Sequence, residues 1–193
     1  MNGSLTWCAR RRPKVFGIGW YGTGTTSLGE ALKLLGYHVL QGPWWCCGAL
    51  DANPTYMQPR DFERYLDAIW LQTQQFDAFQ DFPWMFLYEQ VLEWYPDALF
   101  VLTVRKKPIA FENATLFRRW SMAGPSYLVH RRNVLKFFAT RDRLGRYGDT
   151  DNLLQLNIIG GEGWERLVPF IQRALVYNSP PWEFPWLNSK FGK

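Results

Sequence analysis

The chain has 193 residues and a formal net charge of +5. This length allows a substantial core, and we expect one domain over residues 1–193, with no apolar run of the roughly 18 residues that a membrane span needs. Three cysteines predict no disulfide framework, two histidines predict no metal site, and the basic N-terminus lacks a signal-peptide core, so we expect a cytoplasmic protein. The basic residues are spread out and form no nucleic-acid motif, so no nucleic-acid partner is expected; the oligomeric state stays open.

The first pattern in the chain, residues 14–36, predicts a strand, a tight turn and a helix. An apolar run ending at Ile18 leads into a Gly- and Thr-rich segment, Gly19 to Ser27, and then into leucines at helical spacing. Glycines allow close backbone approach, and the unpaired amides of a helix start attract anions. The pattern favours a phosphate-like ligand; the alternative is a turn that binds nothing. No lysine lies between Gly19 and Glu30, which argues against a Walker A loop and so against an ordinary ATPase or GTPase, and disfavours a nucleotide kinase.

Alternating strands and helices follow. We expect a strand at 37–40, a long loop to residue 59, a helix from Asp61 as its N-cap to about residue 75, and a strand at 76–82. Pro83 then opens a helix, and residues 98–104 form a buried strand that ends at Arg105. In the long loop, Trp44 and Trp45 either form a wall for an acceptor or cover the edge of the core.

The second half predicts a helix at 108–120, a helix at 127–138, a charged loop at 141–151, a strand at 152–158, a turn at 160–163 and a helix at 164–174. Such alternation indicates an α/β fold of three layers, α/β/α, with a central parallel sheet. Ligands of these sheets bind beyond the carboxyl ends of the strands. The glycine loop, Asp81 and Arg105 all follow strand ends, so we expect them to meet at one edge.

The glycine loop resembles the 5′-phosphosulfate loop of sulfotransferases. A closer resemblance is to small sulfotransferase-like proteins of the P-loop nucleoside triphosphate hydrolase class, and it rests on four ordered motifs. These are Gly24-Thr25-Thr26-Ser27-Leu28, Asp81-Phe82-Pro83, Leu102-Thr103-Val104-Arg105 and Gly161-Glu162-Gly163-Trp164-Glu165-Arg166-Leu167. The resemblance implies transfer of a sulfuryl group from 3′-phosphoadenosine 5′-phosphosulfate (PAPS) to a hydroxyl or amine of a small-molecule acceptor.

The resemblance also implies roles for individual residues. The loop residues hold the 5′-phosphate end of the nucleotide, namely Gly22, Thr23, Gly24, Thr25, Thr26 and Ser27. Arg105 and Asn113 hold the 3′-phosphate, and Asp81 is the catalytic base. Arg105 could instead pair with a carboxylate and Asp81 could cap a helix; His38 and His130 are the other possible bases, although structural roles suit both better.

The chain departs from these relatives at two positions. Gly22 stands where they carry Lys or Arg, and Asn113 stands where Ser is usual. Without the loop cation, the alternative function is a nucleotide-binding protein that does not catalyse transfer. Another cation could replace the missing one: Lys106, Lys107, Arg118 or Arg119 are the candidates, whereas Lys14 begins the first strand and lies too far away.

Overall fold

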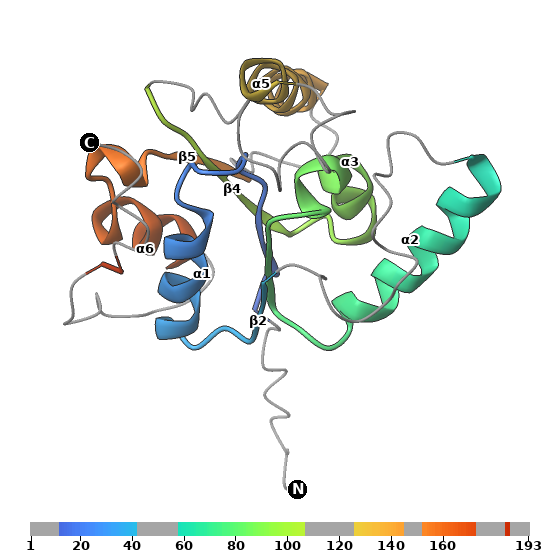
Figure 1. The fold of residues 1–193 in the computed structure, drawn as a ribbon, viewed down its shortest axis with the longest axis horizontal. Coiled ribbons are helices and arrows are strands. Elements are labelled where there is room, and N and C mark those ends of the chain that lie inside the picture. Colours follow the sequence, from blue (N-terminus) through green and yellow to red (C-terminus); the bar gives the residue numbers. More distant parts are fainter. Residues whose placement is uncertain (1–11, 42–57, 107–125, 145–151, 173–183, 186–193) are drawn as a thin grey trace, which may run out of the picture.

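A computed structural model describes residues 12–41, 58–106, 126–144, 152–172 and 184–185 (Figure 1). The strands are β1 (Val15–Gly17), β2 (Val39–Gln41), β3 (Ala78–Gln80), β4 (Leu99–Thr103) and β5 (Leu153–Leu156). The helices are α1 (Thr25–Leu34), α2 (Pro59–Thr73), α3 (Trp84–Trp94), α5 (Tyr127–Leu144) and α6 (Trp164–Gln172), with a short 3₁₀ helix, η3 (Ile158–Gly160). Among these described helices, none is long and apolar enough to cross a membrane.

The strands form one five-stranded sheet in the order β2-β3-β1-β4-β5, and every pair is parallel. The predicted parallel sheet is therefore confirmed. In register, Gly17 at the end of β1 pairs with Gln80 on one side and with Val101 on the other. The carboxyl ends of the three central strands consequently lie side by side.

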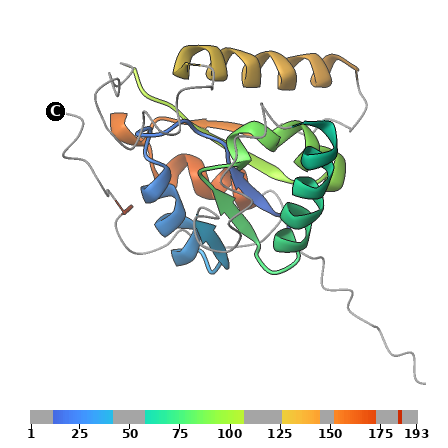
Figure 2. The same cartoon turned by 45° about the vertical axis from the view of Figure 1, so that its right-hand side comes forward.

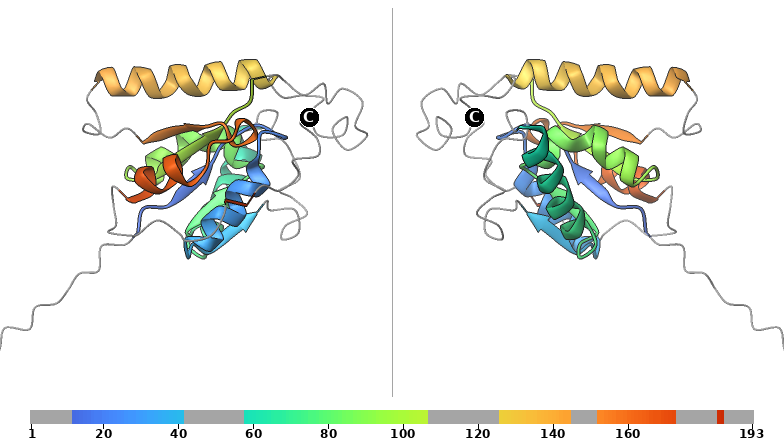
Figure 3. Two further views of the ribbon diagram at one scale, coloured as in Figure 1. Left: turned by 90° about the vertical axis from the view of Figure 1, so that its left-hand side faces the viewer. Right: turned by 90° about the vertical axis from the view of Figure 1, so that its right-hand side faces the viewer.

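Helices cover both faces of the sheet, which confirms the three-layer prediction (Figures 1 and 2). Successive strand residues point to opposite faces, so Phe16 and Val15 enter different cores. Phe16 lies in an aromatic-rich core with residues of α2, α3 and α5. Val15 lies in a second core, mostly aliphatic, with residues of α1 and α6. Figure 3 shows α5 as a long helix beside β4 and β5, on the opposite side of the sheet from α6.

Two predicted boundaries are wrong. Asp61 is not the N-cap of its helix: α2 begins at Pro59 and Gln58 occupies the N-cap position, because proline is well suited to a first helical turn. The charged stretch from Arg141 is not all loop, since α5 continues to Leu144. Trp44, Trp45 and the predicted helix at 108–120 lie outside the described residues.

Candidate functional site

The three strand-end features predicted to converge follow neighbouring strands of the sheet. The glycine loop connects β1 to α1, Asp81 directly follows β3, and Arg105 lies two residues beyond β4. Since β1 lies between β3 and β4, the loop is flanked by Asp81 on one side and by Arg105 on the other. This edge of the sheet is the candidate site.

The glycine loop is fastened to β4 and to α5. The buried hydroxyl of Thr23 lies 2.6 Å from the hydroxyl of Thr103 and also donates to the Trp20 carbonyl. A Cβ atom at Gly19 would lie only 2.9 Å from the backbone nitrogen of Thr103, so glycine is needed there. At the start of the loop, the Ile18 carbonyl is 2.8 Å from Nε2 of the buried His130. These contacts fix the loop from both sides.

Left-handed backbone shapes the rest of the loop. Gly22 has φ 69° and Gly24 has φ 102°, conformations that favour glycine. Gly24 also makes room for η3, because a Cβ atom there would lie 2.9 Å from Cβ of Ile158. No side chain caps α1 and its first turn carries no acidic residue. The N-cap residue of α1, Gly24, thus has no side chain that could bind the first backbone amides of the helix, and helix N-termini attract anions.

The hydroxyls of the loop are mostly engaged within the protein, a point that the sequence did not indicate. Thr23 is committed to Trp20 and Thr103, and the Thr25 side chain hydrogen-bonds Asp81. Ser27 is almost completely buried within α1. Any anion at this loop would therefore be met by backbone amides more than by the predicted row of hydroxyls.

Asp81 has the features of a positioned carboxyl group. Its backbone φ of 67° is left-handed, which is uncommon for a residue other than glycine and recurs at functional sites. Burial raises the pKa of Asp81, while the hydrogen bond from Thr25 acts to lower it. Burial also raises the pKa of Tyr21, and the negative charge of Asp81 raises it further, so the two side chains interact. Helix capping does not explain Asp81, because Pro83 is the N-cap of α3 and no side chain caps that helix.

Arg105 folds back against the glycine loop. Its Nη1 atom donates to the Gly22 carbonyl at 3.0 Å. Its backbone is held by the hydroxyl of Tyr127, which accepts from the Arg105 amide at 3.0 Å and donates to the Arg105 carbonyl at 2.9 Å. Nε of Arg105 is buried and has no hydrogen-bond partner among the described residues. No salt bridge of Arg105 is found in the described part of the chain.

The alternative bases occupy other places. His38 precedes β2 and so lies at the amino edge of the sheet, where its Nδ1 is 3.0 Å from the Gln75 carbonyl. His130 contacts the start of the loop, and burial lowers its pKa, although the bond to the Ile18 carbonyl acts in the other direction. Tyr127 and His130 both hold the site from α5, and sequence reasoning missed these contacts, since a tyrosine and a histidine 22 or more residues beyond Arg105 give no local signal.

Among the candidate replacement cations, Lys106 is exposed and three others, Lys107, Arg118 and Arg119, lie outside the described residues. Asn113 also lies outside them. Lys14, as expected, is at the far edge of the sheet, where its Nζ donates to the Phe76 carbonyl at 2.7 Å.

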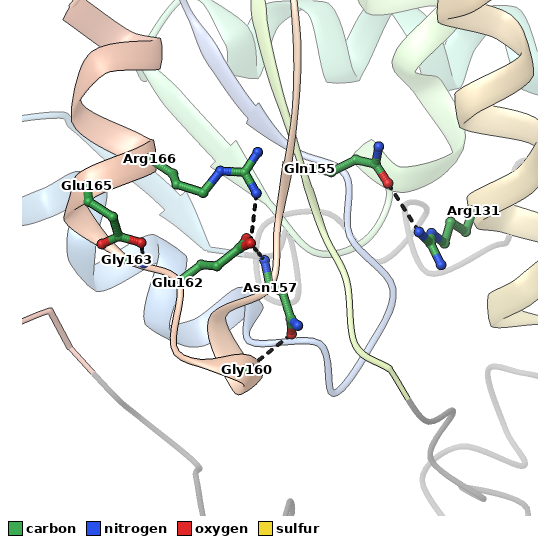
Figure 4. A network of polar contacts seen from close by, with 8 residues as sticks. All are labelled: Arg131, Gln155, Asn157, Gly160, Glu162, Gly163, Glu165 and Arg166. Atoms are coloured by element: carbon green, nitrogen blue, oxygen red, sulfur yellow. Dashed lines mark hydrogen bonds and ion pairs between the residues drawn. The ribbon is translucent and has the colours of Figure 1, made fainter.

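The fourth motif forms a network of polar contacts between the end of β5 and the start of α6 (Figure 4). Glu162 accepts from the Asn157 amide at 2.6 Å and from Arg166 at 2.8 Å, which ties the end of β5 to the start of α6. The Asn157 side chain accepts from the Gly160 amide at 3.0 Å and shapes η3. This network positions Ile158 against Gly24.

Comparison with known proteins identifies the group to which this fold and site belong. A model of the sulfotransferase domain matches residues 14–114, which is more than half of the chain. The chain belongs to the sulfotransferase family. The matched range contains the glycine loop, Asp81 and Arg105, and the fold is the P-loop-like fold of sulfotransferases. Transfer of a sulfuryl group is the general activity that membership indicates. No curated protein matches the chain.

Proposed function

We propose that this sulfotransferase family member moves a sulfuryl group from PAPS to a hydroxyl or amine of a small acceptor. The observation that carries the proposal is the convergence of an anion-binding loop, a carboxyl group and an arginine at adjacent strand ends. PAPS supplies an activated sulfuryl group on a 5′-phosphate. What the protein must add is anion binding, positioning and a proton acceptor.

The residues present fit a donor of this kind. Helix α1 begins after Gly24, which contributes no capping side chain, and the N-terminus of a helix favours a phosphate. The buried, unpartnered Nε of Arg105 is a donor that lacks its acceptor in the described part of the chain, and such atoms are rare in proteins unless a ligand or water satisfies them. The loop lacks the lysine with which a Walker A loop binds the phosphates of ATP or GTP. Gly22, Gly24, Thr25, Thr26 and Arg105 are the proposed nucleotide-binding residues here, with Thr23 and Ser27 supporting the loop from within. Asn113 remains a proposed ligand of the 3′-phosphate from the family resemblance alone.

Asp81 is the proposed base. The side chain of Thr25, at the start of α1, hydrogen-bonds the Asp81 carboxyl group. Thr25 therefore links the proposed proton acceptor to the proposed anion site. A pKa raised by burial suits proton transfer near neutral pH better than an ordinary aspartate pKa does. Thr25 hydrogen-bonds this carboxyl group, and Tyr21 is near enough for the Asp81 charge to raise the pKa of its hydroxyl.

The alternative function is nucleotide binding without transfer, and the absence of a cation at Gly22 favours it. Both functions require the same nucleotide, so the first test is ligand choice. A ligand at about a hundred times its dissociation constant stabilises the folded state by roughly 2.7 kcal/mol. Adenosine 3′,5′-bisphosphate, the product of transfer, should therefore raise the melting temperature clearly.

The comparison ligand is ATP with magnesium at the same concentration. A shift with magnesium ATP that equals the shift with the bisphosphate would contradict the proposed donor.

A further inference from the structure

The outer face of α2 exposes two large apolar side chains that are adjacent in the sequence. Trp70 is 43% exposed and Leu71 is 59% exposed, and the described part of the chain has no other such adjacent pair. The inner face of the helix, with Tyr65 and Ile69, lies in the aromatic-rich core. Figure 1 shows α2 at one outer side of the molecule. Its outer face is therefore accessible to another molecule.

Four exposed residues form a stripe along this face. Arg60, Arg64, Asp67 and Leu71 are spaced by four, three and four residues. This spacing places side chains in one line, and it is the spacing with which paired helices contact each other. We call these four residues the α2 stripe.

The charges of the α2 stripe are not paired within the described part of the chain. The salt bridges there are Lys33–Glu30 on α1 and Arg166–Glu162 at the start of α6, and neither includes a residue of α2. Arg64 and Asp67 are three residues apart and still form no ion pair. Arg60 and Arg64, one helical turn apart, repel each other. Opposite charges from a second molecule would stabilise this arrangement.

The α2 stripe is complementary to its own reverse. Its N-terminal half holds two arginines, and its C-terminal half holds an acid and a leucine. In an antiparallel pair of helices centred midway between Arg64 and Asp67, Arg64 of each copy meets Asp67 of the other. Arg60 then meets Leu71, and the aliphatic part of an arginine side chain covers apolar surface well. A parallel pair would instead place arginine against arginine.

We propose that the α2 stripe is the contact surface of a homodimer, in which two copies of α2 pack antiparallel about a two-fold axis. Such an axis uses the same patch on both subunits, so each ion pair occurs twice. Trp70 borders the stripe and adds apolar area. One pair of helices buries less surface than a standard interface, so the dimer is weak and depends on protein concentration.

Sedimentation velocity over about 1 µM to 1 mM, the range in which weak complexes dissociate, measures this association. The native protein should pass from monomer to dimer as the concentration rises. Arg64→Asp and Asp67→Arg should each weaken the dimer by about 10-fold or more, because two exposed ion pairs become two contacts between like charges. Circular dichroism of each variant establishes that it is folded.

An equimolar mixture of the two variants separates a contact between copies from an effect within one chain. Across the antiparallel pair, the two acids of Arg64→Asp meet the two arginines of Asp67→Arg, so the mixture should associate about as strongly as the native protein. Within each variant chain, positions 64 and 67 carry like charges whether or not the other variant is present. Recovery on mixing therefore requires the proposed contact.

Arg132→Asp is the matched control, since Arg132 is an exposed arginine of α5 and its substitution changes the charge by the same amount. Its association should equal that of the native protein. The proposal is overturned if the native protein stays monomeric over the whole range, or if the mixture associates no better than either variant alone. It is also overturned if Arg132→Asp weakens association as much as Arg64→Asp does, because net charge and not the α2 stripe would then control it.

Discussion

The Tyr127 hydroxyl holds Arg105 through both backbone polar groups, accepting from the amide at 3.0 Å and donating to the carbonyl at 2.9 Å. Tyr127 opens α5, so this side chain also links the end of β4 to that helix. Tyr127→Phe leaves both groups of Arg105 without this partner. We expect a loss of about 1–3 kcal/mol in the free energy of unfolding, measured by urea denaturation.

Tyr65→Phe is the control for this change. The Tyr65 hydroxyl is buried and has no hydrogen-bond partner among the described residues. Its removal should leave stability unchanged or increase it, because an unpaired buried hydroxyl is itself unfavourable. Equal losses in the two variants would mean that the Tyr127 bonds contribute nothing specific.

The contact between the glycine loop and η3 predicts a second difference. Gly24 and Gly161 have nearly the same backbone conformation, with φ of 102° and 98°. A Cβ atom at Gly24 would meet Ile158 at 2.9 Å, whereas one at Gly161 would meet nothing within 4 Å. Alanine at either position carries the cost of left-handed backbone, but only Gly24→Ala adds a steric clash. Urea denaturation should show Gly24→Ala to be less stable than Gly161→Ala by about 1–3 kcal/mol.

The pKa of Asp81 gives a prediction about pH. Burial holds this pKa above its ordinary range, opposed by the Thr25 hydrogen bond. The stabilising contribution of the protonated carboxyl is fully present below the unfolded pKa of about 3.9, and is lost as the pH rises through the folded pKa. Asp81→Asn removes this titration. Its melting temperature relative to the native protein should therefore rise as the pH increases over that interval.

Melting curves from about pH 3 to pH 8 test this expectation, and the exposed Asp67 on α2 provides the control for loss of one negative charge as Asp67→Asn. If the melting temperature of Asp81→Asn relative to the native protein falls with rising pH, the folded pKa of Asp81 is lowered and not raised.

Glu162 should show the opposite pH dependence. Although its partial burial acts to raise the pKa of Glu162, the Asn157 amide and Arg166 outweigh that effect and hold the pKa below its usual range. Its contribution to stability is therefore present above the unfolded pKa of about 4.3 and is lost as the pH falls through the folded value. Glu162→Gln should be less stable than the native protein at pH 7, and the difference should shrink in acid. Thermal melts of the variant and the native protein at pH 7 and in acid check this expectation. A difference in melting temperature that is the same under both conditions would contradict it.

The sequence predicted the order of strands and helices well because local patterns encode it. The apolar run before Gly19 and the buried run before Arg105 became β1 and β4, and their positions at strand ends brought the site together. Hydrogen-bond partners were less predictable, since they depend on distant residues. Thr25 bonds Asp81 and Thr23 contacts Thr103, 80 residues away. A threonine in a glycine loop looks the same in sequence whether its hydroxyl faces a ligand or the interior.

The contact between Arg105 and Gly22 is also not encoded locally. Gly22 has a left-handed backbone, and Arg105 reaches its carbonyl only because β4 is adjacent to β1. Strand adjacency in a parallel sheet follows from the whole fold. The sequence therefore indicated that the loop lacks a cation at Gly22, and the structure showed that the Arg105 guanidinium group, which follows β4, contacts the loop there.

Sulfuryl transfer itself provides the most direct test of the proposed enzyme. Radiolabelled PAPS is incubated with the protein and a panel of phenols, aliphatic alcohols and amines, and label on the acceptor is measured. The native protein should label at least one class of acceptor, and Asp81→Asn should lower turnover by about 10² to 10⁴ while leaving affinity for adenosine 3′,5′-bisphosphate unchanged. A native protein that binds the bisphosphate yet labels no acceptor, or an Asp81→Asn variant as active as the native protein, would contradict the account.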